Sequence, residues 1–148
     1  MEWTQLHRDM LDDLVHTMHH EKFINDDFYQ VQAKKATRPD YVVQAITNYC
    51  IVSQSLLNEM TRQIIHTEIS FLRINIAAHD MYAKNRSIGA ERVKNACMRL
   101  IGACHEKNRK GCYSALVVTK NEFSELRKKF STMVKLERKI LENELADM

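Results

Sequence analysis

His79 is the side chain in this sequence whose position best suits a chemical role. It lies within residues 71–88, where apolar residues recur with the period of an α-helix. The core stripe of this helix is predicted to hold Ile74, Ala78, Met81 and Asn85. At 100° per residue, His79 falls about 140° away from Ile74, outside that stripe. We therefore expect the imidazole to face solvent.

The outer face around His79 carries fewer charges than a solvated helix surface usually does. Six residues are expected to share this face with the histidine: Leu72, Asn75, Ile76, Tyr82, Ala83 and Arg86. An exposed surface with several apolar residues is typical of a docking site for another protein. A neutral imidazole is a nitrogen nucleophile near pH 7, so a histidine at the centre of such a surface suits phosphoryl transfer. The residues alone leave open a second interpretation, a surface histidine on a partner-binding helix.

Other residue types that bind metals or act as nucleophiles show no comparable pattern. The four cysteines have no C-x-x-C spacing, and we interpret them as small buried apolar residues. His16 and His20 could place two imidazoles one helical turn apart, but no carboxylate or thiolate partner is indicated. We expect no metal site among these residues.

The composition predicts one all-α domain, residues 1–148. Hydrophobic residues make up 45% and charged residues 28% of the chain, which is an ordinary globular balance. Three glycines and one proline are too few for many tight turns, so long helices with few connections are favoured. A net charge of +3, with basic and acidic residues interleaved, does not indicate nucleic-acid binding. Neither a membrane span nor a signal peptide is visible, so we expect a soluble intracellular protein.

The apolar spacing predicts two N-terminal helices in residues 1–36 and a four-helix up-down-up-down bundle in residues 39–146. The two N-terminal stripes are predicted to hold Leu6, Met10, Leu14 (or Leu11) and Met18, and then, after a cap at Asn25 or Asp26, Phe28 and Val31. The bundle helices are expected to begin at Pro39, near Ser70, at about Ala90 and at about Cys112. The first bundle helix is predicted to bury Val42, Ile46, Tyr49, Ser53, Leu56, Met60 and Ile64. Residues 34–38 and 108–111 are predicted connections, and Gly89 marks a break.

Residues 79–97 carry a motif as well as a periodicity, and they read HDMYAKNRSIGAERVKNAC. This segment resembles the signature of plant histidine-containing phosphotransfer proteins, approximately HQLKGSSSSIGAxRVKxxC. The eight-residue step from the histidine to the serine of SIGA is kept, from His79 to Ser87, and SIGA and RVK match residue for residue. Weaker likenesses to the same family continue along the chain at residues 26–28, 39–42, 106–112 and 123–136.

The resemblance implies a phosphorelay carrier in cytokinin signalling rather than an enzyme that turns over. His79 would accept a phosphoryl group from the receiver domain of a hybrid sensor histidine kinase and pass it to the receiver domain of a response regulator. The receiver domains would supply Mg²⁺, so the chain would need no cofactor of its own. A monomer, divided between cytoplasm and nucleus, is the expected form.

Two positions beside His79 depart from the family pattern. Tyr82 stands where the family has lysine, and Ala83 stands where it has glycine. A lysine one turn along the helix would offer a cation to the phosphoryl oxygens, whereas tyrosine adds bulk without charge. The resemblance also covers family members that lack the histidine and act as decoys. The alternative hypothesis is therefore a pseudo-phosphotransfer protein that binds receiver domains without relaying phosphate.

Overall fold

The computed structural model describes residues 2–147, and this range is helical with no strand, which confirms the all-α prediction. The elements in chain order are α1 (Glu2–His20), α2 (Asp27–Ala33), the short 3₁₀ helix η1 (Lys34–Ala36), α3 (Tyr41–Ile65), α4 (Phe71–Ile88), α5 (Glu91–His105) and α6 (Arg109–Ala146). None of these helices is long and apolar enough to cross a membrane.

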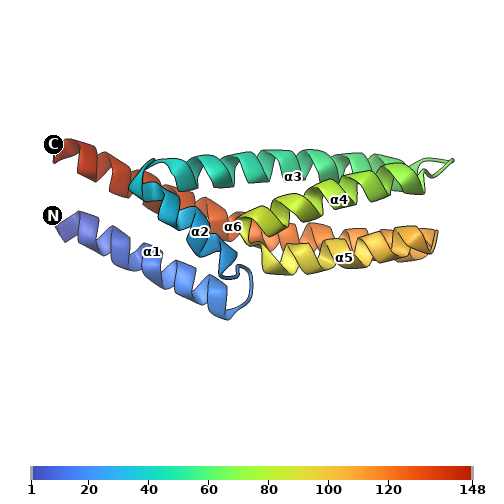
Figure 1. Ribbon diagram of the computed structural model, residues 1–148, viewed down its shortest axis with the longest axis horizontal. Coiled ribbons are helices and arrows are strands. Elements are labelled where there is room, and N and C mark those ends of the chain that lie inside the picture. Colours follow the sequence, from blue (N-terminus) through green and yellow to red (C-terminus); the bar gives the residue numbers. More distant parts are fainter. Residues whose placement is uncertain (1, 148) are drawn as a thin grey trace.

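Helices α3 to α6 form an antiparallel bundle, as the short connections predict (Figure 1). Each packs against the next along the chain, and α6 packs against α3 to close the ring. The 38 residues of α6 span about 57 Å, so this helix extends past the bundle. Its C-terminal part carries α1, which runs antiparallel to it, while α2 lies across α3 and α4 (Figure 1).

The core stripes of the bundle helices follow the predicted spacing with one shift of register. In α4, the predicted stripe residues Ile74, Ala78, Met81 and Asn85 are all buried. In α3, Leu57 is buried, whereas the predicted Leu56 is only partly covered. Both leucines fit a helical repeat, and the contacts of α3 with α4 and α6 select the second.

The predicted stripe of α1 is wrong in its first two positions. Leu6 and Met10 are 47% and 48% exposed. The buried residues of α1 are Thr4, Leu11, Val15 and Met18. Because α1 packs against a single helix, α6, only a narrow face of it is covered. The apolar residues outside that face remain in solvent.

The helix ends reflect local capping chemistry. The Ser70 hydroxyl accepts a hydrogen bond from the Arg73 backbone N–H at 3.2 Å, as predicted for the start of α4. Asn108 caps α6 in the same way, through Gly111, so α6 begins three residues before the predicted Cys112. Gly89 ends α4 in the left-handed conformation, with φ at 81°.

Of the two caps predicted before α2, Asn25 makes the capping bond, whereas the start of α3 differs from the prediction. The Asn25 side chain accepts a hydrogen bond from the Asp27 N–H at 2.9 Å, whereas the Asp26 side chain makes no capping bond. Pro39 precedes α3 by two residues instead of opening it, because Asp40 occupies the N-cap position. The predicted connection 34–38 contains the single 3₁₀ turn η1.

Candidate functional site

The structure places His79 on the exposed face of α4, near the middle of that helix. The opposite face is buried through Ile74, Ala78, Met81 and Asn85. Leu72 and Ile76, on the turns before the histidine, are 68% and 53% exposed. An accessible imidazole with exposed apolar side chains on the preceding turns has the character of a docking surface.

Buried polar contacts hold α4 in place beneath this surface. The Tyr49 hydroxyl of α3 donates a hydrogen bond to the Asn85 side-chain oxygen, and the Asn85 amide donates to the Cys97 sulfur of α5 at 3.4 Å. Burial raises the pKa of Tyr49 well above its usual value and raises the pKa of Cys97 to about 12. Both groups therefore stay protonated near neutral pH. The network joins three helices and fixes the orientation of α4.

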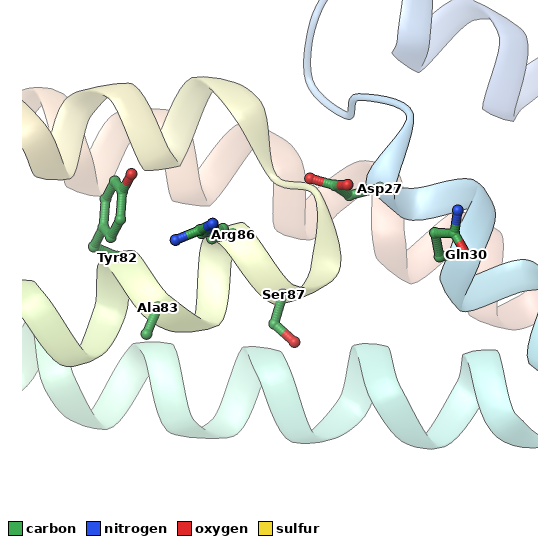
Figure 2. A pocket seen from close by; sticks show the side chains of 6 residues that line it. All are labelled: Asp27, Gln30, Tyr82, Ala83, Arg86 and Ser87. Carbon is green, nitrogen blue, oxygen red and sulfur yellow. The ribbon is translucent and has the colours of Figure 1, made fainter.

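A hollow of about 440 Å³ lies along α4 on the C-terminal side of His79 (Figure 2). Its lining comes from two elements, namely Tyr82, Ala83, Arg86 and Ser87 of α4 and Asp27 and Gln30 of α2. Tyr82 is half-buried and packs against the core, whereas Ala83 and Arg86 are exposed. The guanidinium group of Arg86 points back toward Tyr82, away from Asp27 (Figure 2).

The six predicted neighbours of His79 thus fall into three environments. Leu72 and Ile76 are exposed, and Tyr82, Ala83 and Arg86 line the hollow. Asn75 is half-buried, and its side-chain oxygen is covered without a hydrogen-bond partner among residues 2–147.

Asp27 and Gln30 were not among the predicted site residues. Helix periodicity within residues 71–88 cannot reveal them, because they reach α4 only through the packing of α2. The likeness of residues 26–28 to the family was the one sequence signal near them. Across residues 2–147, no three His, Cys, Asp or Glu side chains gather as metal ligands do.

Comparisons with known proteins agree with this architecture. No protein-family model matches the chain. Histidine-containing phosphotransfer protein 1 of Oryza sativa subsp. japonica is 32% identical over 131 residues, covering 88% of this chain and 89% of that protein. Pseudo histidine-containing phosphotransfer protein 6 of Arabidopsis thaliana is 28% identical over 126 residues, covering 84% of this chain and 82% of that protein.

The solved structures extend the likeness to the whole fold. A histidine-containing phosphotransfer protein from rice superposes with a TM-score of 0.89 at 31% identity, covering 93% of this chain and 98% of that one. One from maize gives 0.86 at 31% identity, covering 90% and 99%. Fold and exposed histidine together define a helical bundle of the phosphotransfer class. The chain belongs to the family of plant histidine-containing phosphotransfer proteins, whose function is histidine phosphotransfer in two-component signalling.

Proposed function

We propose that this protein carries a phosphoryl group on His79 between two receiver domains of the cytokinin phosphorelay. The observation that supports this most directly is the exposed position of His79 on α4, eight residues before Ser87 in the matching motif. The donor would be the receiver domain of a hybrid sensor histidine kinase. The acceptor would be the receiver domain of a response regulator.

The chemistry requires little of the chain beyond an accessible and correctly placed imidazole. A ring nitrogen of neutral His79 attacks the phosphorus of an aspartyl phosphate, so that a P–N bond forms while the P–O bond to aspartate breaks. The second receiver reverses the step when its aspartate takes the group. The receiver domain supplies Mg²⁺ in each transfer, so the chain acts as a phosphoryl carrier without a cofactor.

The docking surface that we propose for receiver domains surrounds His79. Leu72 and Ile76 present exposed apolar area on one side of the histidine. Tyr82, Ala83 and Arg86 border the hollow on the other side, and Asn75 lies between Leu72 and Ile76 along α4. Burial of the two apolar side chains would drive association, while Arg86 offers a cation to the partner. We propose that the protein works as a monomer in the cytoplasm and the nucleus.

Transfer from a radiolabelled, phosphorylated receiver domain tests this function. We expect wild type to acquire an acid-labile, alkali-stable label, and His79→Gln to acquire none. His79 is exposed, so the substitution should leave the fold intact, which circular dichroism can verify. His105→Gln, another exposed histidine, is the matched control and should be labelled like wild type. Wild type that binds the receiver domain but never becomes labelled would refute the proposal.

A further inference from the structure

A second recess lies between α3 and α6, helices that close the bundle ring on the side away from the α4–α5 pair. Its volume is about 260 Å³, and no residue of α4 lines it. We call it the α3/α6 groove. Its apolar lining consists of Ile46, Cys50, Ile51, Phe130 and Val134.

Apolar area is accessible in this groove. Ile51 of α3 is 66% exposed, although a branched aliphatic side chain gains free energy from burial. Cys50 beside it is half-buried, and burial raises the pKa of its thiol, partly opposed by the nearby Arg127. Phe130 forms the floor and is fully buried in the core. The exposed Ile51 side chain is suited to contact an apolar side chain from outside.

The rim of the groove is basic and has no acidic counterpart. Arg127, Lys135 and Arg138 of α6 line it, all three are exposed, and no carboxylate is among the lining residues. None of the three forms an ion pair within residues 2–147. Arg127 donates only a weak hydrogen bond, at 3.3 Å, to the side-chain oxygen of Gln54. The groove therefore combines apolar area with uncompensated positive charge.

The groove is long enough for a short helix to lie along it. Its α6 wall runs from Arg127 to Arg138, which is about 16 Å or three helical turns. It is a recess between the neighbouring antiparallel helices α3 and α6, so a third helix can lie along it. Charge complementarity requires acidic residues on that helix, beside its apolar stripe.

We propose that the α3/α6 groove binds an acidic amphipathic helix of a partner protein while His79 remains free on α4. Apolar residues of that helix, spaced by three and four, would cover Ile51 and Cys50. Its carboxylates would pair with Arg127, Lys135 and Arg138. This inference does not depend on the phosphotransfer role of His79, because the two surfaces share no residue.

A synthetic peptide of leucine and glutamate, about 15 residues long with leucines at helical spacing, serves as the probe. Fluorescence anisotropy should detect its binding to the full-length protein, and a scrambled peptide of the same composition should bind at least tenfold more weakly. Cys50 offers a second readout, because the other three cysteines are buried. Bound peptide should slow alkylation of Cys50 several-fold.

Charge reversal and its control separate a specific groove from general attraction. Lys135→Glu with Arg138→Glu should weaken peptide binding at least tenfold, and Ile51→Ser should weaken it several-fold. Lys110 is an exposed lysine outside the groove, and Lys110→Glu should change the affinity for the peptide by less than twofold. All the substituted side chains are exposed, so the variants are expected to fold.

Four results would overturn the proposal. The first is a scrambled peptide that binds as tightly as the helical one, and the second is a Lys110→Glu variant that loses as much affinity as the groove variants. The third is protection of Cys50 from alkylation by phosphatidylserine vesicles but not by the peptide. The fourth is protection of Cys50 by a rising concentration of the protein alone. The last two would assign the groove to a lipid surface or to a second copy of the chain. Competition between the peptide and a phosphorylated receiver domain would refute the claim that His79 remains free.

Discussion

At the scale of single residues, the chemical surroundings of His79 depend on the two side chains one turn further along α4. Tyr82 occupies that position with its ring half-buried against the core, and Ala83 follows it in the open. Neither side chain can donate a charge to phosphoryl oxygens. The nearest cation on this face is Arg86, whose guanidinium group points back toward Tyr82 (Figure 2).

Tyr82→Lys should accelerate phosphoryl transfer to His79 roughly tenfold, because a charge-assisted hydrogen bond to the phosphoryl group stabilises the transition state by about 1.4 kcal/mol or more. Rapid-quench kinetics with a phosphorylated receiver domain would measure the rate. Tyr82→Leu is the control, since it removes the phenol without adding charge. Equal rates for the lysine and leucine variants would show that charge at this position does not limit transfer.

At the scale of elements, the junction of α4 and α5 is packed tightly against the start of α2. Gly89 has φ at 81°, and a Cβ built there would lie 2.6 Å from the Phe28 backbone nitrogen and 2.7 Å from the Asn25 side-chain oxygen. The Asn25 backbone N–H also donates to the Gly89 carbonyl at 2.9 Å. This close approach positions α2 over α4 and so helps to form the hollow.

Gly89→Ala should lower the free energy of unfolding by about 3 kcal/mol, through the left-handed backbone and the clash with α2. Gly102→Ala is the matched comparison, because Gly102 lies in α5 with no heavy atom within 4 Å of the added Cβ. The free energy of unfolding of Gly102→Ala should rise by about 0.5–1 kcal/mol, because alanine has a higher helix propensity than glycine. Urea unfolding measures both, and destabilisation of the two variants by similar amounts would contradict the assigned role of Gly89.

Glu91 connects the start of α5 to the same junction and makes it sensitive to acid. Its carboxylate accepts hydrogen bonds from the Asn25 amide and from Lys94, which hold the pKa of Glu91 below its ordinary value. A lowered folded-state pKa contributes stability above the unfolded-state pKa, and that contribution is lost as the pH falls through the folded-state value.

Glu91→Gln should therefore be less stable than wild type at pH 6.5, with a difference that shrinks toward pH 3. Urea unfolding at a series of pH values would follow this change. A difference that stays constant across the series would mean that the ionised carboxylate contributes nothing at this junction.

At the scale of the whole molecule, a nearly buried ion pair ties the N-terminal segment to the long last helix. Lys35 of η1 contacts Glu137 of α6 at 2.8 Å, and Glu137 is only 2% exposed. The two residues are 102 positions apart in the chain. This contact therefore holds η1, which precedes the bundle helices, against the C-terminal part of α6.

Lys35→Met should lower the free energy of unfolding by about 2 kcal/mol or more, because it leaves the Glu137 carboxylate buried and unpaired. The double variant Lys35→Met with Glu137→Leu should recover most of that loss, since both charges are gone. Lys128→Met breaks an exposed pair with Glu125 and should change stability by less than about 0.5 kcal/mol. Thermal unfolding compares these stabilities. Equal stability of Lys35→Met and of the double variant would contradict an energetic coupling between Lys35 and Glu137.

The sequence by itself determined the helices, most of their core stripes and the outward position of His79. Periodicity, the Ser70 cap and the break at Gly89 all depend on neighbours within a few residues, so they can be read locally. The motif from His79 to Cys97 identified the family for the same reason, because it is a contiguous stretch of chain.

Only the tertiary structure decided which of several equivalent helical faces became buried. Leu6 and Met10 are exposed because α1 packs on α6 alone, and Leu57 replaces Leu56 because of the neighbours of α3. Asp27 and Gln30 reached the hollow, and Lys35 reached Glu137, through packing between distant segments. These choices follow from the free energy of contacts across the chain, and local helix periodicity does not contain that information.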